Sequence, residues 1–149
     1  MITVEEFMTS ELSTLRESDS IEDARRIMTE KHIRHIPITD GDRHLIGLVT
    51  QRDVLAATAP DHLDPANTEA VSALSLANIM IRDVSIIHTT DSLRKAAMYM
   101  QSHKYGCLPV VNDGRLVGII TDSDFIAIAI NLIELAELNE DEIGAQDAL

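Results

Sequence analysis

The sequence has few aromatic side chains and a single cysteine. Aromatic residues make up 3% of its 149 residues, with no Trp, two Tyr and two Phe, so any apolar core must be aliphatic. The one cysteine, Cys107, excludes an intrachain disulfide and a cysteine-rich zinc site. Apolar residues still make up 45% of the chain, which is enough for a folded core and argues against wholesale disorder.

Basic residues and long apolar runs are also scarce. There are 12 Lys and Arg against 25 Asp and Glu, a formal net charge of -13. That balance argues against a binder of nucleic acid or of anionic membranes, which both require a basic face. The acidic N-terminus does not resemble a signal peptide, and the apolar stretch 125–138 is too short to span a bilayer. We therefore expect a cytoplasmic protein that binds neither nucleic acid nor membrane.

The basic residues that are present gather in one window. Residues 25–52 hold six of the twelve, whereas residues 56–77 and 126–149 hold none. A locally basic segment in an acidic chain favours a small anionic ligand over a polymeric one. The alternative interpretation is that long basic side chains simply cover a solvated helix face.

The second half of the chain repeats the first. Matches separated by 72 positions include Met8 with Met80, Ser20 with Ser92, and Pro37 with Pro109. After one deletion, Gly47, Thr50 and Asp53 recur as Gly118, Thr121 and Asp124. We divide the chain into repeat one over residues 1–59, a linker over 60–77, repeat two over 78–139 with an apolar closing helix, and an acidic tail over 140–149.

Each repeat predicts the same order of elements, β-α-β-β-α. A short first strand is expected at 12–15 and 84–87, and a helix capped by Ser20 or Ser92 follows it. A hairpin then joins strands 36–39 and 45–50, or 108–111 and 116–121, and a closing helix begins near residue 51 or 122. Proline in the first hairpin strand cannot donate to a ladder, so it predicts a place where pairing stops. An ordinary edge-strand proline is the alternative.

The most specific motif is Gly47-x-x-Thr50-x-x-Asp53, repeated as Gly118-x-x-Thr121-x-x-Asp124. Thr-x-x-Asp before an apolar helix is a variant of the capping box, in which the two side chains satisfy the first helical amides. An Asp at a strand end also has the two acceptor oxygens that suit the diol of a ribose. The motif alone leaves both interpretations open.

In order along the chain, these pieces resemble a tandem pair of CBS domains, the Bateman module, over residues 2–130. The pieces are Phe7-Met8-Thr9, Arg34-His35-Ile36-Pro37-Ile38 and Gly47…Thr50…Asp53, with Ile79-Met80, Cys107-Leu108-Pro109-Val110 and Gly118…Thr121…Asp124 as the second set. The resemblance implies an α+β fold in which the two CBS repeats pack as a pseudo-twofold pair. It also implies an adenine nucleotide (AMP, ADP or ATP) as a regulatory ligand in the cleft between them.

The resemblance carries particular roles onto this sequence. For the first site it implies Thr14, Ile36, Pro37, Thr50 and Asp53, with Arg34, His35 and Arg52 near the phosphates. For the second it implies Ile86, Leu108, Pro109, Thr121 and Asp124, with Lys104 or a residue of the other repeat as its cation. Charge-assisted contacts are the stronger ones, so we expect unequal sites, the first preferring the more phosphorylated ligand.

Other classes of function find little support. No phosphate-binding loop, dinucleotide fingerprint or catalytic triad signature occurs, so we expect no catalytic residues and no enzyme. His32 and His35 lack a third ligand at suitable spacing, so we expect no metal site.

The closing helix is apolar almost all round, which predicts burial in a homodimer formed through helices, or alternatively against the linker. Output would then act in trans on an unknown effector protein. The competing hypothesis is a structural dimerisation module with vestigial or empty pockets.

Overall fold

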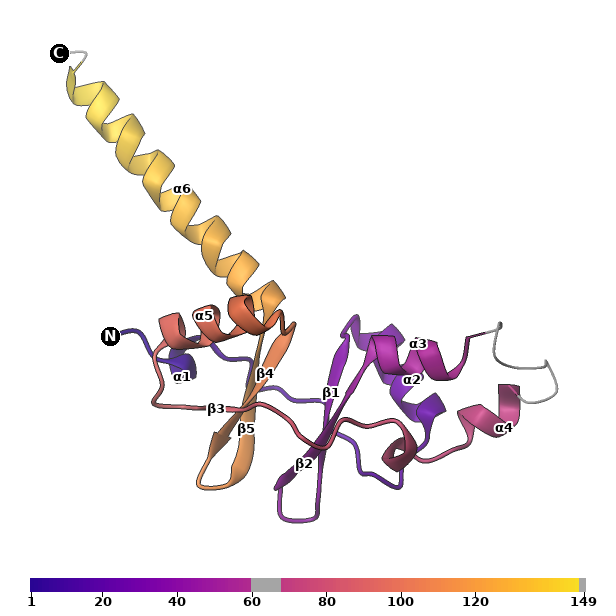
Figure 1. Ribbon diagram of the computed structural model, residues 1–149. Coiled ribbons are helices and arrows are strands. Elements are labelled where there is room, and N and C mark those ends of the chain that lie inside the picture. Colours follow the sequence, from indigo (N-terminus) through magenta and orange to yellow (C-terminus); the bar gives the residue numbers. More distant parts are fainter. Residues whose placement is uncertain (60–67, 148–149) are drawn as a thin grey trace.

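The computed structural model describes residues 1–59 and 68–147 and contains two α+β units side by side (Figure 1). The first holds α2 (Ile21–Lys31), β1 (His35–Thr39), β2 (Leu45–Thr50) and α3 (Gln51–Ala57). The second holds β3 (Ile87–His88), α5 (Leu93–His103), β4 (Cys107–Asn112), β5 (Arg115–Thr121) and α6 (Asp122–Asp147). The short helices α1 (Val4–Phe7), α4 (Thr68–Ser72) and η2 (Leu76–Asn78) complete the described part. The predicted α+β class is confirmed.

The first long helix of each repeat begins and ends in the same way. Ser20 Oγ accepts the Asp23 N–H at 3.1 Å, and Ser92 Oγ accepts the Lys95 N–H at 3.0 Å, so both predicted N-caps are confirmed. Both helices end at a residue in the left-handed region, His32 and then Lys104 at the matching position. The repeat in the sequence is therefore a repeat in backbone geometry, down to the caps.

The two hairpins also match each other. β1 pairs antiparallel with β2 from His35–Thr50 onward, and β4 pairs antiparallel with β5 from Cys107–Thr121 onward. Each hairpin has a register shift at the same place, after Ile38 and after Val110. The predicted hairpins are confirmed.

The first strand of each repeat is shorter than predicted, because proline ends its ladder. In repeat two only β3 pairs, in parallel with Val110 and Val111 of β4, and in repeat one the strand is reduced to a single bridge from Leu15 to Ile38. The next rung would need an N–H from Pro37 or Pro109, which proline lacks. The backbone just before each first strand is consequently left out of the sheet.

Each repeat completes its core with a segment from the other half of the chain. Val4 in α1 is fully buried in a cluster with the apolar residues of α5, β4 and β5. Leu76 from the end of the predicted linker and Met80 from the start of repeat two are buried against the hairpin of repeat one. The predicted linker 60–77 is thus helical in α4 and η2 and contributes Leu76 to a core, while residues 60–67 lie outside the described residues.

The closing helix of repeat two is much longer than its counterpart. α6 runs for 26 residues, includes most of the predicted acidic tail, and projects away from the two units (Figure 1). Seven large aliphatic side chains along it are more than half exposed: Ile126, Ile130, Leu132, Ile133, Leu135, Leu138 and Ile143. None of the helices in the described part of the chain combines the length and apolar character that a membrane crossing requires.

Candidate functional site

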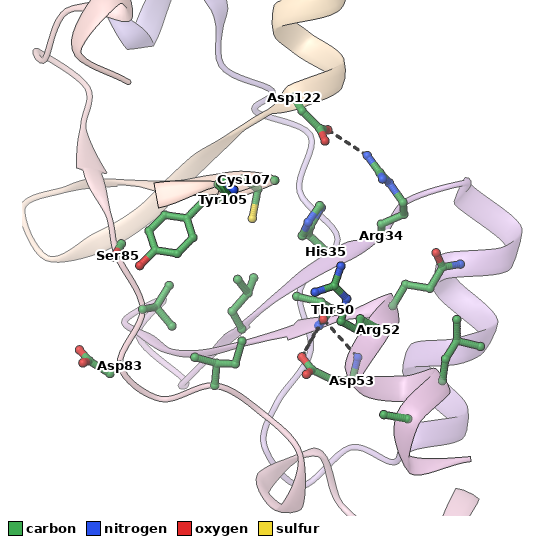
Figure 2. Close-up of a pocket in the computed structure, with 18 residues that line it drawn as sticks. Arg34, His35, Thr50, Arg52, Asp53, Asp83, Ser85, Tyr105, Cys107 and Asp122 are labelled. Atoms are coloured by element: carbon green, nitrogen blue, oxygen red, sulfur yellow. Dashed lines mark hydrogen bonds and ion pairs between the residues drawn. The ribbon is translucent and has the colours of Figure 1, made fainter. Parts of the chain in front are cut away.

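A cavity of about 1080 Å³, here called cavity 1, opens between the repeats (Figure 2). The end of β2 and the start of α3 line one wall, with Thr50 and Asp53. Segments 81–85 and 104–107, both from repeat two, line the opposite wall. Arg34 and Asp122 lie where the two walls meet. Both repeats therefore build this one cavity.

Asp53 is held at the cavity wall by the cap of α3. The backbone N–H and the hydroxyl of Thr50 both donate to Asp53 Oδ2, at 3.0 and 2.8 Å, and the Asp53 N–H donates to Thr50 Oγ1 at 3.2 Å. The capping box is confirmed. These bonds occupy one carboxylate oxygen, and Oδ1 accepts no hydrogen bond from the described residues. The cap thus orients the carboxylate and leaves an acceptor for a ligand.

Three basic side chains line cavity 1, namely Arg34, Arg52 and Lys104. Arg34 Nη2 contacts Asp122 Oδ1 at 2.9 Å, which joins repeat one to the first residue of α6 (Figure 2). Both side chains are about half exposed, so solvent screens this ion pair and it contributes little to stability. The guanidinium is therefore available to a stronger anion.

The two remaining titratable groups at the junction are uncharged near neutral pH. Burial and then the charge of Arg34 lower the pKa of His35, against the opposing effect of Asp122. Burial and then the charge of Asp122 raise the pKa of the Cys107 thiol to about 12. Gly106 lies against the His35 ring, since a Cβ there would be 3.0 Å from Nε2. The positive charge at the cavity therefore comes from Arg34, Arg52 and Lys104.

Tyr105 is a residue of the cavity wall that sequence reasoning missed. Its ring is 42% exposed, and the rings of His103 and Tyr99 continue from it, with centroid distances of 5.4 and 4.1 Å along the series. Both tyrosines of the chain belong to this one cluster. Its position two residues before Cys107, at the entry to a repeated strand, was the signal that could have identified it.

A second cavity of about 180 Å³, cavity 2, lies at the equivalent place with the repeats exchanged. Segments 9–13 and 32–35 of repeat one face residues 119–123 of repeat two. Asp124, the counterpart of Asp53, accepts the Thr121 N–H at Oδ2 (2.8 Å) and the Thr9 hydroxyl at Oδ1 (3.1 Å). The matching position of Thr9 in the other half is Ile81, which cannot donate. Both oxygens of Asp124 are therefore engaged.

The structure groups the predicted site residues by cavity rather than by repeat. Cavity 1 collects Arg34, His35, Thr50, Arg52, Asp53 and Lys104, and cavity 2 collects Arg34, His35, Pro37 and Thr121. Outside both linings are Thr14, Ile36, Ile86, Leu108, Pro109 and Asp124. Ile36, Leu108 and Pro109 are fully buried in the cores.

The two residues predicted from the first strands, Thr14 and Ile86, adjoin the cavity linings without belonging to them. Ser13 and Ser85 line the cavities, whereas the side chains of their neighbours Thr14 and Ile86 are exposed. Successive side chains in extended backbone point to opposite sides, so a shift of one residue exchanges a lining residue for an exposed one.

Two pseudo-symmetric α+β repeats with a cavity on each side of their junction define the class of protein. The chain belongs to the CBS domain family, whose model matches residues 4–59 and 76–131.

Solved structures of CBS proteins are similar over nearly the whole chain. A Vibrio cholerae protein named as an acetoin utilization protein (AcuB) is 44% identical with a TM-score of 0.80, covering 92% of this chain and 96% of that one. The CBS domain pair of protein MJ0100, in complex with 5′-methylthioadenosine and S-adenosyl-L-methionine, is 26% identical with a TM-score of 0.75, covering 88% and 98%. CBSX2 of Arabidopsis thaliana, in complex with AMP, is 27% identical with a TM-score of 0.76, covering 89% and 98%.

Curated relatives carry the same unit within a longer chain. Homoserine O-acetyltransferase of Methanocorpusculum labreanum is 36% identical over 121 residues, which is 80% of this chain and 23% of the relative. This chain therefore spans about a quarter of the length of the curated relatives it matches first.

Proposed function

We propose that this chain is a regulatory module that binds an adenine nucleotide, AMP, ADP or ATP, in cavity 1. The observation that supports the proposal is the free carboxylate oxygen of Asp53, oriented by Thr50, in the same cavity as three cations. A carboxylate accepts hydrogen bonds from the ribose diol, and arginine and lysine bind phosphate. Ring and aliphatic groups of Tyr105 and Val84 line the cavity for the base.

The ligands of similar proteins favour the same class of ligand. CBSX2 is in complex with AMP, and the MJ0100 pair is in complex with two adenosyl compounds. Neither complex fixes the ligand of this chain, whose cations favour a phosphorylated one. A ligand that contacts both walls of cavity 1 favours the relative orientation of the repeats to which it binds more tightly. It shifts the equilibrium between two orientations by the difference in its affinity for them.

The output of such a shift acts on another protein. The exposed aliphatic side chains of α6 favour a homodimer formed through helices, which removes them from water. We propose that an effector protein, of unknown identity, recognises the orientation of the repeats or of the dimer. The 44% identity with the AcuB structure suggests acetoin utilization as the setting, and loss of growth on acetoin after deletion of the gene would test that link.

Thermal unfolding with AMP, ADP, ATP, S-adenosylmethionine and NAD as separate ligands tests the proposal. A ligand present at 100 times its Kd stabilises the folded state by about 2.7 kcal/mol, which raises the Tm by several degrees. We expect that rise with at least one adenine nucleotide and its loss in the variant Asp53→Ala. No rise with any of the five would instead favour a structural dimerisation module with vestigial pockets.

A further inference from the structure

The two cavities share one wall. Arg34, His35 and Asp122 line both cavity 1 and cavity 2, although Arg34 precedes β1 in repeat one and Asp122 begins α6 in repeat two. The ion pair between Arg34 and Asp122, at 2.9 Å (Figure 2), therefore belongs to the linings of both cavities. The repeat places Gly106 and Gln51 at the matching positions, which cannot form such a pair. This contact is a single, unsymmetrical feature at the centre of a symmetrical fold.

Cations are supplied unequally on the two sides of that wall. In cavity 1 Arg34 is joined by Arg52 and Lys104, whose counterparts lining cavity 2 are Ser123 and His32. Arg34 is consequently the one lysine or arginine among the residues that line cavity 2. Glu11 and Asp122 also line cavity 2, so its fixed charge is negative even with Arg34 included.

We infer that Arg34 is a single phosphate-binding cation shared by two cavities, so that only one phosphorylated ligand is held at a time. Cavity 1 takes the nucleotide, because Arg52 and Lys104 add their charges there. Cavity 2 measures about 180 Å³ and its lining offers no other lysine or arginine, so it holds no second phosphorylated ligand. The inference rests on the proposed function, because it assumes that cavity 1 binds a nucleotide.

A bound phosphate can displace Asp122 as the partner of Arg34. The pair with Asp122 is about half exposed, and ion pairs exposed to solvent contribute little to stability. A phosphate offers a guanidinium two parallel charge-assisted hydrogen bonds. Asp122 remains favourably placed after Arg34 leaves, because a carboxylate in the first turn of a helix interacts with the helix dipole. One guanidinium cannot make the same contacts on both sides of the wall, and two phosphates across it would repel each other.

Isothermal titration of the full chain tests the inference with two probes, AMP and 5′-methylthioadenosine. We expect one AMP per chain at the tight site, with any second AMP at least tenfold weaker. 5′-Methylthioadenosine, which has no phosphate, should compete with AMP for that one site. Two AMP molecules that bind with equal affinity and without mutual effect would overturn the inference.

Variants of the ion pair make the test specific. Asp122→Asn removes the competitor of the phosphate, so AMP affinity should rise about fivefold while that for 5′-methylthioadenosine stays the same. Arg34→Gln should weaken the tight AMP site at least tenfold and leave 5′-methylthioadenosine binding intact, which also shows that the variant is folded. Arg82→Gln is the matched control, because Arg82 pairs with Glu17 between the repeats and lines neither cavity.

The outcomes separate this inference from the proposed function. Wild-type protein that binds neither probe contradicts both. Wild-type protein that binds AMP, but whose affinity is unchanged in Asp122→Asn and Arg34→Gln, contradicts only the shared role of Arg34.

Discussion

Cavities 1 and 2 are lined by equivalent segments of the two repeats, but they differ in volume and in the charged groups of their linings. Thr50 with Asp53, and Thr121 with Asp124, form the same hydrogen bonds at the start of a helix. Asp53 keeps a free carboxylate oxygen in a cavity of about 1080 Å³, whereas both oxygens of Asp124 are engaged and cavity 2 measures about 180 Å³. Duplication has thus conserved the caps and the hairpin registers, while single side chains such as Thr9 distinguish the two aspartates.

The comparison is tested most strongly by removing each aspartate. Asp53→Ala and Asp124→Ala lose equivalent capping bonds, and Asp124→Ala also loses the bond from Thr9, so a larger loss of AMP binding in Asp53→Ala reports the ligand contact. Two hydrogen bonds from a diol to a carboxylate contribute about 3 kcal/mol, so Asp53→Ala should weaken AMP about 100-fold. Asp124→Ala should change AMP affinity less than threefold. Titration calorimetry measures both, and equal losses would refute the asymmetry of the cavities.

A second pair of substitutions should show where the repeats are alike. A methyl group on Gly47 would lie 2.8 Å from Met80 Sδ and 3.1 Å from the Ile81 carbonyl oxygen. On Gly118 it would lie 2.5 Å from Met8 Sδ and 3.1 Å from the Thr9 carbonyl oxygen. Because backbone cannot move aside as a side chain can, Gly47→Ala and Gly118→Ala should each lower the free energy of unfolding by about 2 kcal/mol.

Urea unfolding provides the measurement, and Gly144→Ala in α6 provides the control. No atom lies within 4 Å of a methyl group added at Gly144, and alanine is the better helix former. That variant should be as stable as the wild type or slightly more so. If Gly47→Ala or Gly118→Ala proves neutral, the segments that carry Met80 and Met8 do not pack against the hairpin of the other repeat as described.

The sequence predicts the fold well because the fold is local and repeated. The caps at Ser20 and Ser92, both hairpins and the helix starts at Thr50 and Thr121 follow from neighbouring residues, and all are confirmed. The exchange of leading segments is not local. Nothing near Val4 or Leu76 indicates that each is buried in the other half, because that burial depends on how two whole repeats meet.

The same distinction explains the site. Asp53, Arg34 and Arg52 could be selected from the motif and the charge pattern, and cavity 1 contains all three. Their position in one cavity could not be predicted, because it depends on β2 of repeat one facing the segment before β3 of repeat two. The sequence also does not show that Ser13 lines cavity 2 while the side chain of its neighbour Thr14 is exposed. The hydrogen bond from Thr9 to Asp124 spans 115 positions, beyond the reach of any local pattern.

A smaller effect is expected at the position proposed to contact the base. Tyr105 in cavity 1 corresponds to Ile33 in cavity 2, and aromatic contacts contribute about 1 kcal/mol beyond their buried area. Tyr105→Ala should therefore weaken AMP about five- to tenfold, whereas Tyr105→Phe and Ile33→Ala should change its affinity less than twofold. An equal loss in Tyr105→Ala and Ile33→Ala would mean that the base does not contact the ring. Because the chain has no Trp, its fluorescence comes from tyrosine, and it should change when AMP binds beside Tyr105.

The smallest expected effect is a change of stability with pH. It depends on His35 in repeat one and has no counterpart at the matching position in repeat two. Burial and the charge of Arg34 lower the pKa of His35 below its ordinary value of 6.5, so the unfolded chain takes up this proton at a higher pH than the folded one. Stability should then be complete above pH 6.5, fall as the pH drops, and stop falling below the lowered pKa of the folded state. The slope of a single proton is at most about 1.4 kcal/mol per pH unit.

Cys107 occupies the matching position in repeat two, and the pKa of its thiol is about 12, so it remains neutral over the same range. Urea unfolding from pH 7.5 to 5 should therefore show a loss in the wild type that the variant His35→Gln lacks, with other histidines contributing equally to both. Parallel curves for the two proteins would mean that His35 titrates alike in both states. AMP should reduce the loss, because a phosphate beside His35 favours its protonated form and draws the pKa of the folded state back toward the ordinary value.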